Sequence, residues 1–151
     1  MASVLLDTNV LLRLIDSNDA RHAACRHSIE KLLGQGEDVY LAPQVLIEFW
    51  VVSTRPTDAK PPGFGWMPGI ASQHLADVRK TFRMLDDAPG VFERWLHFVE
   101  TYSIRGKRAH DARIVAFMQQ HGIEQILTLN PTDFAGLGVK IVQPQEASVA
   151  P

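Results

Sequence analysis

The sequence predicts an α/β fold, in which a small parallel sheet of four or five strands is flanked by helices. Two observations predict it. Short apolar runs that suit buried strands alternate with longer segments whose apolar residues recur at helical spacing. The first apolar run, at residues 4–6, ends abruptly at Asp7, as a strand does at the carboxyl edge of a sheet.

Length and composition narrow the class of protein. The 151 residues, 46% of them hydrophobic, are enough for one domain with a sizeable core. The net charge of −2 gives no global sign of a nucleic-acid or membrane binder, so a polyanion would be held by a local basic patch or through a metal. Cys25 stands alone, which excludes an internal disulfide and fits a reducing cytosol. We expect a cytoplasmic protein without a membrane span or signal peptide.

The first half of the chain alternates strands and helices in the order of a parallel sheet. After the first strand, Thr8 or Asn9 is suited to cap a short helix that ends near residue 15. A second helix is predicted over residues 20–33, with Asp19 as its N-cap. The next predicted elements are a strand at residues 39–42 and a helix at residues 43–53, which begins at a proline.

A loop rich in proline and glycine follows at residues 54–69, and it is too long for a simple connector. It displays Phe64, Trp66 and Met67. Two interpretations stay open. These side chains stack on bases or receive another chain, or they fold back over the core of the domain itself.

The second half is predicted to contain three helices and two strands. Two of the helices are separated by a turn at residues 86–90, and their apolar residues recur at helical spacing: Leu75, Val78, Phe82 and Leu85 in one, and Phe92, Trp95, Leu96, Val99 and Tyr102 in the other. The remaining elements are a helix at residues 110–120, a strand at 126–129, an exit loop at 130–133 and a strand at 139–142. We expect one domain over residues 1–145 and a frayed tail at 146–151.

Four acidic residues lie at comparable places in these elements. Asp7 ends the first strand, Glu48 lies in the helix after the second strand, Asp111 begins a helix, and Asp133 follows the strand at 126–129. Strand ends and helix starts share one edge of a parallel sheet, so all four can converge there. Clustered carboxylates without an obvious His or Cys set match Mg²⁺ or Mn²⁺. Such a site suits metal-assisted hydrolysis of phosphodiester bonds.

Each acid also has a structural interpretation. Asp7 is suited to be a helix N-cap, and Asp111 to complement a helix dipole. Asp133 fits a turn, and Glu48 fits a thin solvent-facing stripe with Gln44 and Arg55. It is the set, with every member at a predicted edge position, that indicates function.

Four motifs occur in an order that covers nearly the whole chain. They are Leu5-Leu6-Asp7-Thr8-Asn9-Val10-Leu11, Ala42-Pro43-Gln44-Val45-Leu46-Ile47-Glu48-Phe49, His110-Asp111-Ala112-Arg113-Ile114-Val115-Ala116, and Leu127-Thr128-Leu129-Asn130 with Asp133-Phe134. In these motifs the chain resembles the PIN-domain family, and within it the VapC toxins of bacterial toxin–antitoxin operons. The resemblance implies a PIN-like three-layer fold, endoribonuclease activity with Mg²⁺ or Mn²⁺, a homodimer, and a cognate VapB-like antitoxin.

The resemblance also implies roles for single residues. The invariant acids of the family correspond to Asp7, Glu48 and Asp111, which would hold the cation. Where many members have an aspartate shortly after the threonine that ends the strand, this chain has Asn130, and we expect Asp133 to take its place through a water molecule. The expected supporting residues are Thr8, Asn9, Thr128 and Asn130.

Basic residues flank Asp111 and are candidates for contact with RNA phosphates. They are Arg105, Lys107, Arg108 and Arg113. A solvated basic turn explains them equally well.

Other functions were weighed against the nuclease. The main alternative is a catalytically weak or inactive PIN-like module that binds RNA or protein. A phosphotransfer receiver is disfavoured because Asp7 lacks an acidic neighbour and Lys140 is poorly placed for that chemistry. A haloacid-dehalogenase-type phosphatase is disfavoured because Asp7-Thr8-Asn9 lacks a second carboxylate.

Overall fold

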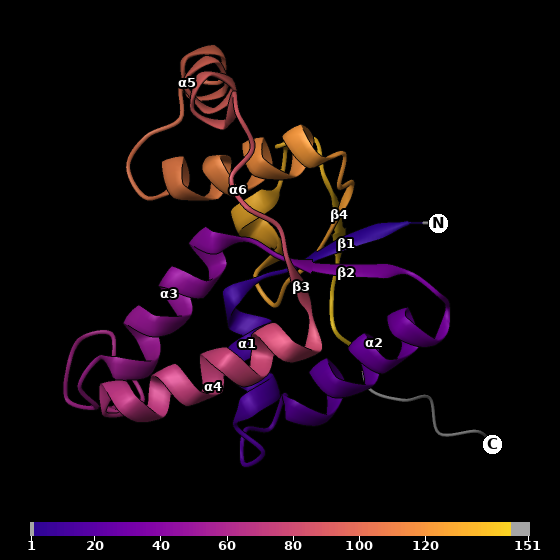
Figure 1. Cartoon of the computed structure of the whole chain (residues 1–151). Coiled ribbons are helices and arrows are strands. Elements are labelled where there is room, and N and C mark those ends of the chain that lie inside the picture. The colour runs from indigo at the N-terminus through magenta and orange to yellow at the C-terminus, as the bar shows by residue number, and fades with distance from the viewer. Residues whose placement is uncertain (1, 146–151) are drawn as a thin grey trace.

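The computed structural model describes residues 2–145, which form three layers with a five-stranded parallel sheet in the middle (Figure 1). The strand order is β3-β2-β1-β4-β5, and every neighbouring pair is parallel. All carboxyl ends therefore lie at one edge of the sheet. The strands are β1 (Ser3–Leu6), β2 (Asp38–Leu41), β3 (Arg83–Met84), β4 (Gln125–Leu127) and β5 (Lys140–Val142). The predicted PIN-like α/β fold is confirmed, and the expected frayed tail lies outside the described residues.

Helices cover both faces of this sheet (Figure 1). On one side lies α6 (Arg108–His121), with α5 (Val91–Thr101) packed against its outer surface. On the other side lie α1 (Thr8–Ile15), α2 (His22–Gly34) and α4 (Pro68–Thr81). A further helix, α3 (Pro43–Thr54), packs against α1 and α4 and extends beyond the carboxyl edge.

The core forms around β1, the central strand. Val4, Leu5 and Leu6 are completely buried because helices cover both faces of the sheet, and this explains why the strand reads as an unbroken apolar run. Within the described residues, no helix has the length and apolar character needed to cross a bilayer.

The edge strand β3 was not predicted from the sequence, and the helix predicted through Leu85 is too long. The helix ends at Thr81, and Phe82 already has extended backbone angles, with φ −123° and ψ 147°. The following residues pair with β2, and the Leu85 amide donates to the Leu41 carbonyl at 3.0 Å. The spacing of Phe82 and Leu85 imitates a helix because both side chains pack on the core from an extended segment.

Two predicted helix caps were also wrong. The N-cap of α1 is Asp7 itself, whose side chain accepts from the Thr8 amide, so neither Thr8 nor Asn9 caps the helix. Helix α2 begins at His22, and Asp19 accepts from the Arg21 amide in the preceding turn instead of capping the helix. After β4, the predicted exit loop contains a short 3₁₀ helix, η1 (Pro131–Phe134).

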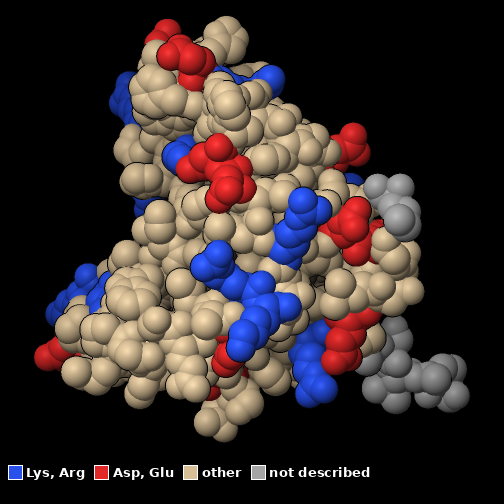
Figure 2. All heavy atoms as spheres, viewed as in Figure 1, with Lys and Arg blue, Asp and Glu red and all other residues tan. Residues whose placement is uncertain are grey.

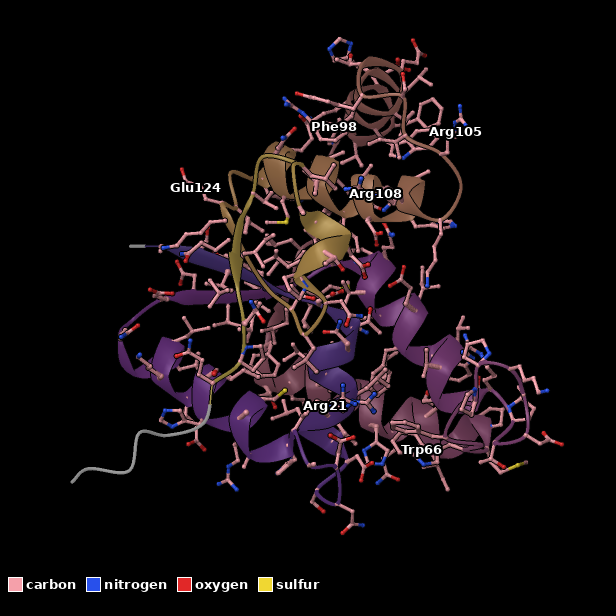
Figure 3. The ribbon with its side chains drawn as sticks, turned by 180° about the vertical axis from the view of Figure 1, so that it is seen from behind. Arg21, Trp66, Phe98, Arg105, Arg108 and Glu124 are labelled. Carbon is pink, nitrogen blue, oxygen red and sulfur yellow. The ribbon has the colours of Figure 1, made fainter. Side chains whose placement is uncertain are left out.

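The proline- and glycine-rich loop folds back on the end of α3. The amides of Phe64, Gly65 and Trp66 donate to α3 carbonyls or to the residue just after the helix, at 2.9–3.1 Å. These contacts satisfy carbonyls that have no partner at a helix end. Trp66 stacks on His74 with ring centroids 4.5 Å apart and lies beside α4 (Figure 3). The fold-back interpretation therefore describes the aromatic residues, while Met67 stays exposed.

Charges of both signs share the face that Figure 2 shows. Basic side chains gather over the end of α4 and over β3, where the sequence places Arg79, Lys80 and Arg83. Acidic side chains lie next to them, near the segment that leads to α5. This face consequently has no field of a single sign.

Substituting Gly63 by alanine should destabilise the fold. A Cβ atom at this position would lie 2.3 Å from the Arg55 carbonyl oxygen and 2.5 Å from that of Val52, so the loop would have to move off α3. We expect a loss of about 1–3 kcal/mol in the free energy of unfolding, measured with urea. Gly69→Ala is the matched control, because a Cβ there meets nothing within 4 Å. Equal stability of the two variants would contradict the fold-back contact.

Candidate active site

A pocket of about 610 Å³ opens at the carboxyl edge of the sheet, and the four predicted acids all line it. Asp7 directly follows β1, and Glu48 lies on α3. Asp111 lies in the first turn of α6, and Asp133 in η1. The fold thus brings the four carboxylates, which are far apart in the sequence, to one cavity, as the parallel topology predicts.

The Asp7 carboxylate is fixed by hydrogen bonds on both oxygens. Its Oδ1 accepts from the Thr8 amide at 2.8 Å, and its Oδ2 accepts from the Thr128 hydroxyl at 2.7 Å and from Asn9 Nδ2 at 3.3 Å. The side chain is buried. Since the Asp7 amide also donates to the Leu127 carbonyl, β1 and β4 both determine where this carboxylate lies.

Thr128 and Asn9 form the support for Asp7 that was predicted. Thr128 Oγ1 also accepts from Asn9 Nδ2 at 3.3 Å and from the Asn130 amide at 3.0 Å. Asn9 Oδ1 accepts from the Leu129 amide at 3.1 Å. Asn130 is exposed and lines the pocket, and its backbone amide is the group that donates to Thr128.

A second set of hydrogen bonds orients Glu48. Its Oε2 accepts from the Thr8 hydroxyl at 3.0 Å, and its Oε1 accepts from Gln44 Nε2 at 3.4 Å. Gln44 Oε1 in turn accepts from Arg113 Nη1 at 3.1 Å, and Arg113 Nη2 forms an ion pair with Asp87 at 3.0 Å. The solvent-facing stripe proposed for Glu48 is therefore a hydrogen-bonded wall of the pocket.

Gln44 and Asp87 were not predicted as functional residues. For Gln44 a signal was present, because a residue four positions before Glu48 on a helix lies on the same face. For Asp87 the sequence offered none, since its partner Arg113 is distant in the chain.

Burial raises the pKa of two of the acids. The pKa of Asp7 rises to about 6 through burial, with smaller contributions from the charges of Glu48 and Asp133, against the hydrogen bonds from Thr128 and Thr8. The pKa of Asp111 also rises to about 6, first through burial and then through the other three acids, while Lys107 opposes the shift.

The donor set suits a hard divalent cation. Among the described residues, none of the four acids is in an ion pair with Lys, Arg or His. Close carboxylates without a cation repel one another, and Mg²⁺ or Mn²⁺ is the partner that oxygen ligands favour. In residues 2–145 no three His, Cys, Asp or Glu side chains already surround a point that would hold a metal.

The four predicted RNA-binding residues do not form one patch. Lys107 lines the acidic pocket. Arg113 is engaged with Gln44 and Asp87, and Arg108 donates to the Ala135 carbonyl at 2.9 Å. Arg105 lies on the exposed segment between α5 and α6 (Figure 3). Arg55, which was not assigned from the sequence, joins Lys107 in lining the pocket.

Comparisons with known proteins agree on the family and the fold. The model of the PIN domain family matches residues 4–138. Ribonuclease VapC24 from Mycobacterium tuberculosis is 27% identical over 139 residues, which are 88% of this chain and 90% of that protein.

Solved structures show the same fold at low sequence identity. FitAcB from Neisseria gonorrhoeae superposes with a TM-score of 0.68 at 20% identity, covering 93% of this chain and 97% of that one. A toxin–antitoxin complex from Klebsiella pneumoniae gives a TM-score of 0.60 at 24% identity, and the match covers 95% of this chain and 99% of that chain.

The metal-free protein should lose stability as the pH rises from 4 to 8, and Asp7→Asn should reduce that loss. A carboxyl group whose pKa is raised in the folded state stabilises the fold fully below its ordinary pKa of 3.8, and this contribution disappears as the pH rises through about 6. For Asp7 the difference between the two pKa values corresponds to about 3 kcal/mol in the free energy of unfolding. Urea unfolding in EDTA, at steps of one pH unit, measures it.

Asp77→Asn is the control for this experiment, because it removes one negative charge from the exposed surface of α4. It should follow the pH dependence of the wild type. An Asp7→Asn protein with that same dependence would show that Asp7 carries no raised pKa.

Proposed function

We propose that this chain, which belongs to the PIN-domain family, is a divalent-metal-dependent endoribonuclease that hydrolyses phosphodiester bonds in RNA. The observation that carries the proposal is the pocket at the carboxyl edge, where four carboxylates that are far apart in the sequence meet and where, among the described residues, none of them is in an ion pair. RNA as the substrate is supported by the similarity to Ribonuclease VapC24 over most of both chains.

Asp7, Glu48 and Asp111 would hold Mg²⁺ or Mn²⁺, with Asp133 reaching it through water. When bound, such an ion polarises the phosphate and lowers the pKa of a coordinated water. The residues of the chain prepare the site for it. Thr128 and Asn9 fix both the position and the rotamer of Asp7.

The remaining neighbours orient the other ligand and the substrate. Thr8 and Gln44 hold the two oxygens of Glu48. Lys107 lies in the same pocket as Asp111, at a place where its ammonium group can contact a phosphate oxygen of bound RNA. Lys107 would thus contact the substrate, while the acids would hold the cation.

We also propose that the chain acts in the cytoplasm as the toxin of a type II toxin–antitoxin system. One of the solved structures that share its fold is a toxin–antitoxin complex. A VapB-like antitoxin would then be its partner, and the active form would be a homodimer.

RNA cleavage should require Mn²⁺ or Mg²⁺ and depend on the acids. Loss of a residue that only orients a metal ligand costs about 10–100-fold in activity or metal affinity. We therefore expect Thr128→Val, which removes the hydrogen bond to Asp7, to reduce kcat/KM within that range. Asp7→Asn and Asp111→Asn should reduce it by more than about 100-fold, because each removes a ligand. End-labelled RNA with metal or EDTA measures these rates.

Asp77→Asn serves again as the control and should cleave like the wild type. Full activity in EDTA, or in Asp7→Asn, would refute the proposed metal site. RNA binding without cleavage under any metal would favour the alternative, an inactive binding module. That alternative draws its support from Asn130, which stands where many family members have an acid.

A further inference from the structure

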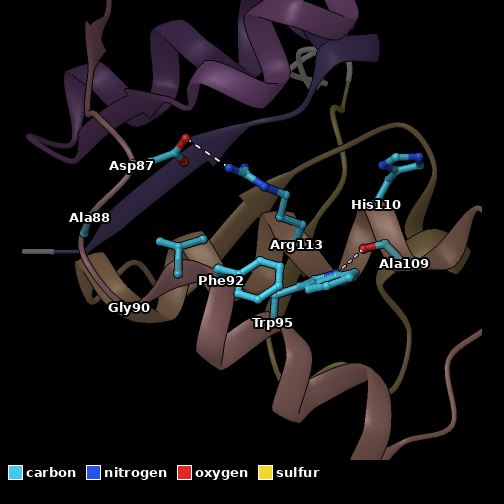
Figure 4. Close-up of a pocket in the computed structure, with 9 residues that line it drawn as sticks. Asp87, Ala88, Gly90, Phe92, Trp95, Ala109, His110 and Arg113 are labelled. Atoms are coloured by element: carbon cyan, nitrogen blue, oxygen red, sulfur yellow. Dashed lines mark hydrogen bonds and ion pairs between the residues drawn. The ribbon is translucent and has the colours of Figure 1, made fainter.

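A second pocket, of about 510 Å³, lies between α5, the start of α6 and the segment that precedes α5 (Figure 4). We propose that it binds one nucleobase of the RNA, next to the phosphodiester bond that is cleaved at the acidic pocket. This inference rests on the proposed nuclease function and adds to it a determinant of sequence preference.

Two aromatic rings form the apolar wall of this pocket. Trp95 is held in place because its indole Nε1 donates to the Ala109 carbonyl at 2.8 Å. The ring centroids of Phe92 and Trp95 are 5.5 Å apart, and the two ring planes are tilted by 41° (Figure 4). Phe92 is 63% exposed. One fixed and one accessible ring can stack on a base, a contact that tolerates any base because each has a π-face.

A charged pair supplies polar groups in the same pocket. Asp87 and Arg113 bond to each other at 3.0 Å, and their side chains remain 41% and 36% exposed. A carboxylate accepts from an exocyclic amino group, and a guanidinium donates to a ring nitrogen or keto oxygen. Every base presents an N–H donor beside an acceptor, the imino N3–H of uracil included, so the pair can bond to any of the four bases. A preference among them then comes from stacking, which is strongest for the larger purine rings.

The two pockets share a wall. His110 lines both of them. Gln44, which lines the acidic pocket, accepts from Arg113 of the second pocket and donates to the His110 carbonyl at 2.8 Å and to Glu48. A nucleotide whose phosphate lies at the acids can thus place its base against Phe92 without leaving the protein surface.

These features favour a nucleobase over a segment of another protein. An apolar side chain would use the aromatic wall but would leave the Asp87–Arg113 pair desolvated and without new partners, which is costly. A base satisfies both the rings and the pair. The second pocket also shares His110 with the acidic pocket, and this proximity favours the RNA substrate over a protein segment.

The test compares Phe92→Ala with Tyr102→Ala. Both residues belong to α5 or its C-cap and are similarly exposed, at 63% and 60%, but Tyr102 lies outside the pocket. A pool of RNA oligonucleotides with random sequence is cleaved with Mn²⁺, and the ends are sequenced. KM is then measured on the preferred sequence.

We expect Phe92→Ala to raise KM by roughly ten-fold, within the range of one base–aromatic stack, and to flatten the base preference at one position beside the cut. Tyr102→Ala should keep both properties of the wild type. Asp87→Asn should raise KM on the preferred sequence, because the substitution removes the carboxylate that accepts from the base. A merely structural role of Phe92 would lower activity on every sequence alike, and urea unfolding checks that each variant is folded.

Each outcome decides between the two proposals. Wild-type RNA cleavage with an unchanged base preference in Phe92→Ala overturns the base pocket and leaves the nuclease standing. Failure of the wild type to cleave RNA with Mn²⁺ overturns both. Loss of antitoxin binding in Phe92→Ala, with RNA cleavage and preference unchanged, would make the pocket a protein-docking site and also overturns the inference.

Discussion

The arrangement of the carboxyl edge depends on one buried negative charge, the Asp7 carboxylate. A buried carboxylate is costly unless donors or a cation compensate it. Thr8 and Thr128 supply donors, yet burial and the neighbouring acids still raise its pKa to about 6. The hydrogen bonds fix where the charge lies, but they leave part of the desolvation penalty and of the repulsion from the neighbouring acids uncompensated. A divalent ion would remove both the repulsion and much of the desolvation penalty.

The four acids are far apart in the sequence, so the hydrogen bonds that position them join residues that are also far apart. Thr128 joins β4 to Asp7, and Thr8 joins α1 to Glu48. Gln44 then links Glu48 to Arg113 on α6. The hydrogen bonds that orient the proposed metal ligands thus extend to Arg113, which lines the second pocket beside Phe92 and Trp95. In our account, the position of the scissile phosphate and the choice of the base beside it are set by one continuous network.

The sequence predicts those features that depend on local pattern. The run before Asp7 indicates a buried strand. Three of the four acids fall at or near element boundaries and Glu48 lies in the second turn of α3, so the shared edge follows from parallel topology. The strand β3 is two residues long and follows an amphipathic helix, and the residues that flank it, Phe82 and Leu85, have a spacing that also fits a helix. The Arg113 contacts with Gln44 and Asp87 depend on tertiary geometry. Phe92 and Trp95 fit an ordinary helix face, and nothing local distinguishes a pocket wall from a core.

The most direct test of the central claim is a crystal structure grown with Mn²⁺, with the ion located by its anomalous scattering. We expect one strong anomalous peak in the acidic pocket, with oxygens of Asp7, Glu48 and Asp111 as its ligands or as partners of its coordinated waters. The account would be contradicted if these carboxylates kept their metal-free positions at saturating Mn²⁺, without an anomalous peak between them.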